Sequence, residues 1–348
     1  MSRGTSSSPR RAVMADVAGL AGVSQQTVSR VLNGHPSVSP AARTRVLAAV
    51  EELDYRPHSA ARALASRRTR MIGVVSYDTT LHGPASTLYG IEQAARRSGY
   101  SVSVTSAKSI DGDHASHALE RLNRQSVDGA IVIAPQRSTV EALRTVPSDL
   151  PVVAVEGGEG NGHSTVCVDQ VEGAALATRH LLSQGAESVF HIAGPADWLE
   201  AQGRVAGWRG EIERTGIEPP EPLRGDWSPA SGYANGQLLA ERSDVRAVFV
   251  ANDQMALGVL RAFHERGVRV PADVLVAGFD DIPEAAYFTP PLTTIRQDFN
   301  AVGRASIDLL LQQITGHAPS GESVVIAPEL ITRHSSIGNL RESAFPKQ

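Results

Sequence analysis

Residues 16–33 read DVAGLAGVSQQTVSRVLN and predict two short helices joined by a tight turn. The first helix covers residues 15–21 in this interpretation. Gly22 begins the turn, because glycine tolerates the positive φ that such turns often need. Ser24 is a suitable N-cap for the second helix, which covers residues 25–32. This arrangement is typical of a helix-turn-helix.

A third helix is expected after the Asn33-Gly34 stop signal. Ser39 supplies its N-cap and Pro40 takes its first position, where the missing N–H of proline does no harm. The apolar spacing predicts an inward face on each helix. The expected inward residues are Val17, Leu20, Ala21, Val28, Val31, Leu32, Val46, Leu47, Val50 and Leu53.

The second helix presents Gln25, Gln26, Ser29 and Arg30 outward. Glutamine pairs with adenine edges, arginine with guanine or phosphate, and serine with either. Residues 1–70 contain 11 arginines and four acidic residues, a net charge of +7, whereas the remainder carries −11. A three-helix bundle with a solvated polar face is the alternative, but these residue types in a basic module favour DNA.

Residues 58–65 (HSAARALA) show a short helical pattern between Pro57 and the arginine-rich residues 66–70. Such a helix is too short to persist alone, since about 12–15 residues are normally needed. One interpretation is a flexible linker. The other is a helix that forms only against DNA and a partner copy, with Leu64 as an apolar wedge between minor-groove base steps.

From residue 71 onward, short apolar runs rich in β-formers alternate with amphipathic helical patterns, which predicts parallel sheets wound by right-handed crossovers. The pattern restarts near Val166 after the glycine-rich residues 156–162, which indicates two similar α/β lobes. Ligands of such lobes bind at the carboxyl ends of strands. The expected strands are 71–76, 100–105, 130–134, 152–155, 166–168, 188–192, 247–251 and 274–278. The expected helices are 86–98, 115–124, 172–184, 204–215, 230–241 and 254–266.

Several stretches resemble the lactose/galactose-repressor family of bacterial regulators, and its lactose-repressor subgroup in particular. The resemblance runs from about residue 13 to 335. The family usually has threonine just before the first helix, whereas Val13 here can neither cap that helix nor contact phosphate. Besides residues 16–33, the matching stretches are LDYRP (53–57), ALA (63–65), LHGP (81–84), AGP (193–195), RVAGW (204–208), GDWS (225–228), VANDQMALG (250–258), GFDD (278–281) and PPLTTIRQDF (290–299).

The resemblance implies an N-terminal all-α helix-turn-helix domain with a hinge helix, followed by an α/β two-lobed periplasmic-binding-protein-like core of parallel sheets. The chain would cross between the lobes near residues 168, 297 and 327. The expected parts are a tail (1–12), the DNA-binding domain (13–57), the hinge and linker (58–70), the sugar-binding and dimerisation core (71–335) and a second tail (336–348). Lobe one would comprise about 71–168 and 298–326, and lobe two about 169–297 and 327–335.

The site residues follow from the same stretches. We assign DNA contact to Ser24, Gln25, Gln26, Thr27, Ser29, Arg30, Asn33, Tyr55, Ala61 and Leu64. We assign ligand contact to Leu81, Pro84, Glu156, Arg204, Trp227, Asn252, Asp280, Gln297 and Phe299.

The chemistry of the ligand set suits a sugar, and we expect its main members at strand ends or in the loops that follow. Arg204 can donate a forked pair of hydrogen bonds, Asp280 accepts from hydroxyls and Asn252 does both. Trp227 and Phe299 offer flat apolar faces to a pyranose ring. Structural alternatives stay open: an Arg204–Asp280 salt bridge, core packing of the two aromatic rings, and Asn252 as a helix cap. Glu156 stands where the lactose-repressor subgroup has aspartate.

These observations predict a homodimeric repressor of sugar-utilisation genes, which a galactoside-like inducer releases from a pseudo-palindromic operator. A different glycoside effector is the first alternative, a soluble sugar-binding protein the second and an enzyme on the same scaffold the third. No nucleophile–base motif is evident, and the single Cys167 excludes a disulfide framework, so we expect no enzyme, metal or cofactor. No signal or membrane segment is evident, which favours the cytoplasm. The tail has one weak spacing, Ile337 and Leu340, before Pro346, so we expect dimers without a C-terminal coiled coil.

Overall fold

The computed structural model describes residues 12–32, 35–55, 68–107, 112–133, 150–156, 162–317 and 321–338, with Gln136, Arg137, Thr139 and Leu143. The chain forms two compact units, Met1–Thr69 and Arg70–Gln348. Among the described helices, none has the length and apolar character needed to span a bilayer.

The first unit is the predicted helix-turn-helix, built from α1 (Met14–Ala21), α2 (Gln25–Leu32) and α3 (Pro40–Glu52). Gly22 closes α1 with a left-handed φ of 64°. Ser24 Oγ accepts a hydrogen bond from the Thr27 backbone N–H at 3.2 Å, and Ser39 Oγ accepts one from Ala42 at 3.3 Å. The predicted turn and both caps are therefore confirmed.

The core of this unit is smaller than the sequence predicts. Val17, Ala21, Val28, Val31 and Val46 are buried, but Leu20 is 48% exposed and Leu47 is 51% exposed. The inward assignment of these two leucines was wrong, because the small side chains Ala18 and Ala49 occupy the interface instead.

The side chain of Val13 does not cap the N-terminus of α1 by a hydrogen bond. The Val13 backbone N–H donates to Asp16 Oδ2 at 2.8 Å. Asp16 also places a negative charge in the first turn, where the helix dipole favours it.

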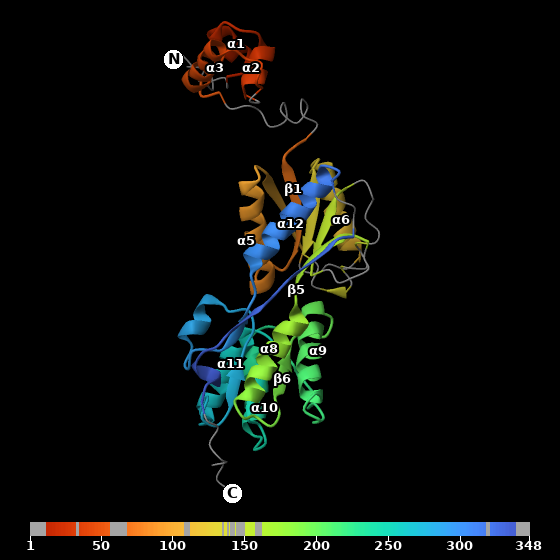
Figure 1. Cartoon of the computed structure of the whole chain (residues 1–348), viewed down its shortest axis with the longest axis vertical. Helices are drawn as coiled ribbons and strands as arrows, with labels where there is room; N and C mark the ends of the chain where they lie inside the picture. Colours follow the sequence, from red (N-terminus) through yellow and green to blue (C-terminus); the bar gives the residue numbers. More distant parts are fainter. Residues whose placement is uncertain are drawn as a thin grey trace, which may run out of the picture. The chain divides into compact units, whose positions relative to one another are not determined.

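Lobe one of the second unit is a six-stranded parallel sheet with the order β11-β5-β4-β3-β1-β2. Helices α5 (His82–Arg97) and α12 (Phe299–Ile314) cover one face, and α6 (Gly112–Arg124) covers the other (Figure 1). The strands are β1 (Met71–Tyr77), β2 (Ser101–Ala107), β3 (Gly129–Ile133), β4 (Val152–Val155), β5 (Ser164–Val168) and β11 (Ser323–Ile326).

Lobe two is a four-stranded parallel sheet with the order β7-β6-β8-β9. Its hydrophobic core has one part on each face of the sheet. The strands are β6 (Phe190–Ala193), β7 (Leu223–Arg224), β8 (Ala247–Val250) and β9 (Leu275–Ala277). The helices are α8 (Gln170–Ser183), α9 (Leu199–Glu213), α10 (Pro229–Ala240) and α11 (Asp253–Glu265).

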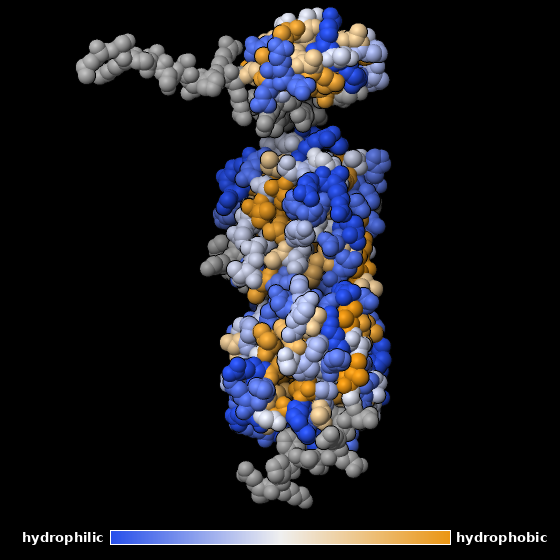
Figure 2. All heavy atoms as spheres, turned by 90° about the vertical axis from the view of Figure 1, so that its left-hand side faces the viewer, coloured by the Kyte–Doolittle hydropathy of each residue, from blue (hydrophilic) through white to orange (hydrophobic). Residues whose placement is uncertain are grey.

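Three connections join the lobes: from β5 into α8, from β10 (Thr294–Arg296) into α12, and from β11 into β12 (Glu329–Ile331). Strands β10 and β12 pair antiparallel as a separate two-stranded sheet. The predicted two-lobed parallel architecture is confirmed, whereas α12 and strands β7, β10, β11 and β12 were not predicted. The side of the molecule in Figure 2 is largely hydrophilic, with small apolar patches scattered over both lobes.

Helices α5 and α12 approach each other closely through two glycines. A Cβ atom at Gly90 would lie 2.4 Å from the Phe299 carbonyl oxygen, and one at Gly303 would lie 2.2 Å from the Gly90 carbonyl carbon. Only glycine permits this approach, which fixes the start of α12 against lobe one.

Candidate functional site

The outer face of α2 carries the predicted DNA-reading side chains. Gln25, Gln26 and Arg30 are exposed, and Thr27 and Ser29 are half-buried. The Ser24 and Thr27 hydroxyls lie 3.0 Å apart, so both help to close the helix N-terminus.

Of the other residues assigned to DNA contact, one is buried and three lie outside the described residues. Tyr55 is 7% exposed and packs in the core of the helix-turn-helix. Most of its side chain is therefore in contact with the protein and not available to DNA. Asn33, Ala61 and Leu64 lie outside the described residues.

A cavity of about 270 Å³ lies between the two lobes. Lobe one contributes Thr80 to Pro84, from the loop after β1 and the start of α5. Lobe two contributes side chains from α9, from the start of α11 and from the loops after β7 and β9. Of the predicted ligand residues, it brings together Leu81, Pro84, Arg204, Trp227, Asn252, Asp280 and Gln297.

Four buried side chains form a ring at this cavity that consists of three hydrogen bonds and one ion pair. Arg204 Nε donates to Gln170 Oε1 at 2.9 Å, and Gln170 Nε2 donates to Gln297 Oε1 at 2.9 Å. Gln297 Nε2 donates to Asp280 Oδ1 at 2.7 Å. Arg204 Nη2 completes the ring at 3.7 Å from Asp280 Oδ1. The ring joins α8, α9, the loop after β9 and the connection into α12.

Arg204 lies in the middle of α9, so the expectation that it sits at a strand end was wrong. Its Nη1 also donates to the Ala251 carbonyl, and its guanidinium carbon lies 3.8 Å from the centroid of the Phe279 ring. The structural alternative, a salt bridge between Arg204 and Asp280, is present in the structure, and both residues also line the cavity.

Asn252 and Trp227 likewise have structural roles as well as places in the cavity wall. Asn252 Oδ1 caps α11 by accepting from the Met255 N–H at 2.9 Å, and its Nδ2 donates to the Trp227 carbonyl at 3.1 Å. Trp227 is 7% exposed and packs edge-to-face with Trp198, with centroids 5.4 Å apart. Both tryptophans line the cavity.

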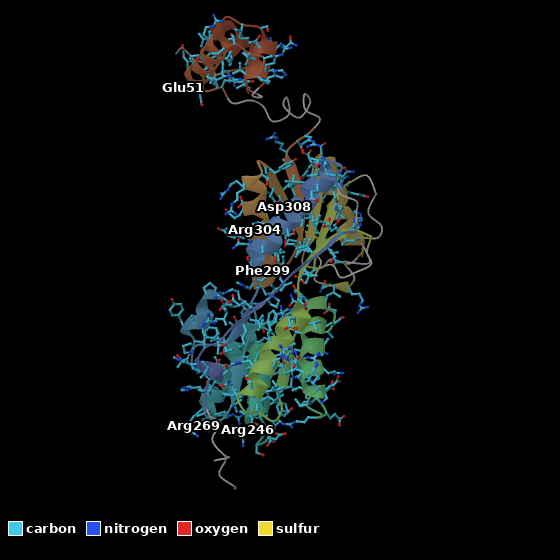
Figure 3. The ribbon with its side chains drawn as sticks, viewed as in Figure 1. Glu51, Arg246, Arg269, Phe299, Arg304 and Asp308 are labelled. Atoms are coloured by element: carbon cyan, nitrogen blue, oxygen red, sulfur yellow. The ribbon has the colours of Figure 1, made fainter. Side chains whose placement is uncertain are left out.

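Phe299 and Glu156 do not line this cavity, contrary to the sequence assignment. Phe299 is the first residue of α12, after the Asp298 cap, and lies where the two lobes meet (Figure 3). Its ring meets the His82 ring edge-on, with centroids 5.7 Å apart, and borders a hollow of about 820 Å³ that shares His82, Asp280 and Gln297 with the cavity. Glu156 Oε1 accepts from the Val168 N–H at 3.0 Å, so it ties the end of β4 to the end of β5.

Burial dominates the electrostatics around the cavity. It raises the pKa of Glu200 to about 7 and that of Glu156 to about 8, in each case against the attraction of Arg204. Burial also raises the pKa of Asp280, although Arg204 and the Gln297 hydrogen bond oppose the change. Acidic neighbours strengthen the shifts of the two glutamates, because like charges disfavour ionisation.

Sequence reasoning missed Gln170 and Glu200. Gln170 has no distinguishing motif, because glutamine in a first helical turn is common. Glu200 precedes Arg204 by one helical turn, and that spacing places both side chains on one face of α9. The spacing was the available signal. Among the described residues, no three His, Cys, Asp or Glu side chains gather as metal ligands would.

Comparisons with known proteins agree with this architecture. Residues 13–58 match the family described as bacterial regulatory proteins, lacI family, and residues 178–336 match the periplasmic binding protein-like domain. The lactose operon repressor of Escherichia coli (strain K12) is 35% identical over 334 residues, which cover 95% of this chain and 92% of that protein.

Two solved structures are also similar over nearly the whole chain. The lac repressor dimer bound to operator and the anti-inducer ONPF superposes with a TM-score of 0.87 at 34% identity, covering 94% of this chain and 100% of that one. The complex of the transcriptional regulator CelR with cellobiose gives a TM-score of 0.70 at 32% identity, covering 93% and 100%.

Proposed function

The chain belongs to the lacI family of bacterial regulatory proteins, and from this premise we propose that it represses sugar-utilisation genes and leaves its operator when a galactoside fills the cavity between the lobes. Operator binding would use two copies of the chain, with the two α2 helices in successive major grooves of a pseudo-palindrome. In that complex, residues 58–65 would form the hinge helix, with Ala61 and Leu64 at the minor groove.

The observation that carries the proposal is the buried ring of Arg204, Gln170, Gln297 and Asp280 at a cavity walled by two tryptophans. Convergent polar groups beside aromatic faces are what a sugar requires. At about 270 Å³, the cavity is just below the usual range of roughly 300–1,000 Å³ for ligand sites, which favours a small glycoside.

A galactoside suits this cavity because its axial 4-hydroxyl leaves a continuous C–H face for Trp227. Its hydroxyls can then exchange hydrogen bonds with Arg204 and Asp280. Another glycoside is the second candidate, and the similarity to the CelR–cellobiose complex supports keeping it. A sugar-binding protein without a DNA role is less well supported, because the chain includes a folded helix-turn-helix.

The test is operator affinity, measured by fluorescence anisotropy with and without a panel of galactosides and other glycosides. We expect a galactoside to weaken operator binding of the wild type. If only another glycoside releases the operator, that glycoside is the effector and the galactoside assignment is wrong. If no sugar releases the operator, the proposal is contradicted.

Two variants locate the site. Arg204→Ala should bind the operator nearly normally but resist release, because it removes the guanidinium that donates to sugar hydroxyls and leaves Gln170 Oε1 without its donor. Arg209→Ala removes an exposed arginine from the same helix and should behave like the wild type. A normal response of Arg204→Ala to inducer would place the effector elsewhere.

A further inference from the structure

The cavity between the lobes contains more acidic than basic groups. Glu200, Asp226 and Asp280 line it, together with a single guanidinium, Arg204. Arg204 is already held by the Ala251 carbonyl and Gln170, and it faces Asp280 at 3.7 Å. Asp280 is therefore the ion-pair partner of Arg204, whose attraction for Glu200 only partly offsets the burial of that carboxyl group.

The Asp226 carboxylate already has hydrogen-bond partners within its own turn. Its Oδ1 accepts from the Ser228 backbone N–H at 2.9 Å and from the Ser228 hydroxyl at 2.5 Å. These hydrogen bonds lower the pKa of Asp226 and keep it ionised at the rim of the cavity.

Glu200 is the carboxylate that remains. It lies in the first turn of α9, is partly buried, and lines the cavity. Within the described residues, no group donates a hydrogen bond to it. Besides Arg204, the titratable groups facing this region are Asp226, Asp280, Glu156 and His82, and the acids among them only disfavour its charge.

Two further polar atoms of the wall have no hydrogen-bond partner within the described part of the chain. They are Trp227 Nε1, on a side chain that is 7% exposed, and Gln254 Oε1. Buried polar groups are normally paired, so a ligand is the natural partner for both. The cavity therefore has unsatisfied acceptors at Glu200 and Gln254 and one unsatisfied donor at Trp227.

We infer that the effector of this cavity carries a basic amino group, as an amino sugar does, and that its ammonium pairs with the Glu200 carboxylate. An ammonium offers three donors and no acceptor, which complements a cavity wall that contains an unpaired carboxylate and an unpaired amide oxygen. The hydroxyls of the same sugar remain for Arg204 and Asp280. This inference rests on the proposed function, because it names the class of sugar that fills the same cavity.

A divalent cation does not fit the same acceptors. Calcium requires about six to eight oxygen ligands, whereas the wall offers one unpaired carboxylate and one amide oxygen. A purely structural role for Glu200 is the remaining alternative, since an acidic residue in a first turn stabilises a helix through its dipole.

Calorimetry on the full-length protein separates these alternatives. The probes are methyl β-D-galactoside, its 2-amino-, 3-amino- and 6-amino-deoxy derivatives, and the matching N-acetyl derivatives. At pH 7.5 we expect at least one free amine to bind roughly tenfold or more tightly than both the neutral parent and its N-acetyl form, because only the ammonium pairs with a carboxylate. The preference should fall at pH 5.5, where Glu200 is protonated.

Glu200→Gln should lose the preference for the amine while it retains binding of the neutral parent. Glu213→Gln removes an exposed carboxylate from the same helix and should retain the preference. A structural role would instead lower binding of all the sugars together. The wild-type comparison of amine with parent needs no variant, so a folding defect in Glu200→Gln does not affect it.

Two results overturn the inference without affecting the proposed function: equal affinity of the wild type for amine and parent, or operator release by neutral galactosides alone. Tight, Glu200-dependent binding of an amine that leaves the operator complex intact supports the contact between Glu200 and an ammonium but contradicts the proposed function.

Discussion

Gln297 Nε2 donates a hydrogen bond to Asp280 Oδ1 at 2.7 Å, and this contact ties the ligand cavity to the connection that enters α12. Asp298, the next residue, caps α12 by accepting from the Ala301 N–H at 2.8 Å. Helix α12 in turn packs on α5 through Gly90 and Gly303. A ligand that changes the hydrogen bonding of Asp280 therefore acts on the segment that positions lobe one.

Gln297→Ala should weaken the link between the effector and the operator. The variant retains Arg204 and Asp280, so we expect sugar affinity to fall by less than about tenfold, the loss of one typical hydrogen bond. Allosteric coupling of this kind is typically about 1–3 kcal/mol, and we expect a large part of it to disappear. Operator titrations at saturating and zero effector measure the coupling directly. Unchanged coupling would show that the signal passes through another connection.

The DNA-reading role of α2 is tested by Gln26→Ala. Gln26 is exposed on the first turn of α2, where an amide can contact an adenine edge. We expect relaxed base preference at one symmetric operator position, at a cost of about 1–3 kcal/mol per contact. Binding to a library of operator variants measures it, with the exposed Glu51→Gln on α3 as a control that keeps the preference. Equal weakening on every sequence would indicate a backbone contact instead.

The sequence was most informative where local chemistry alone determines structure. The bounds of α2 were predicted to the residue, because Ser24 and Gly22 mark the turn before it through capping and a left-handed φ. Leu20 and Leu47 were misplaced because their burial depends on which small residues the neighbouring helices present. Periodicity within one helix does not contain that information.

The candidate site shows the same division. Trp227, Asn252 and Asp280 follow strands, so topology places them at the cavity. Phe299 was expected at a strand end or in a loop, but it begins α12, a helix that was not predicted, and its ring borders the adjoining hollow. The ring through Gln170 joins residues 127 positions apart in sequence, and no single-sequence pattern reports such a pair.

The buried carboxylates predict a pH dependence of stability. Glu200 and Glu156 have folded-state pKa values of about 7 and 8, above the ordinary value of 4.5. Between pH 4.5 and 7 the folded chain thus holds more protons than the unfolded chain, so the free energy of unfolding falls as pH rises through this window. The contribution of Glu200 is on the order of 1–3 kcal/mol.

Urea unfolding at pH 5, 6, 7 and 8 checks this for the wild type and Glu200→Gln. Glutamine cannot ionise, so the variant should gain stability relative to the wild type as pH rises. Comparing the two proteins cancels the opposite effect of His191, whose pKa burial lowers to about 3. A constant difference across the series would mean that Glu200 ionises normally.

The close approach of α5 and α12 gives the last prediction, Gly90→Ala. The added Cβ would lie 2.4 Å from the Phe299 carbonyl oxygen, and backbone cannot yield as a flexible side chain does. We expect a loss of about 1–3 kcal/mol or more in the free energy of unfolding, as for other overpacked sites. Gly210→Ala is the matched control, because its Cβ would meet nothing within 4 Å in the last turn of α9. That change should stabilise the protein by roughly 0.5–1 kcal/mol, since alanine is the better helix former. Urea denaturation measures the change in the free energy of unfolding for both variants. Equal stability of Gly90→Ala and the wild type would show that the two helices can move apart without a loss of stability.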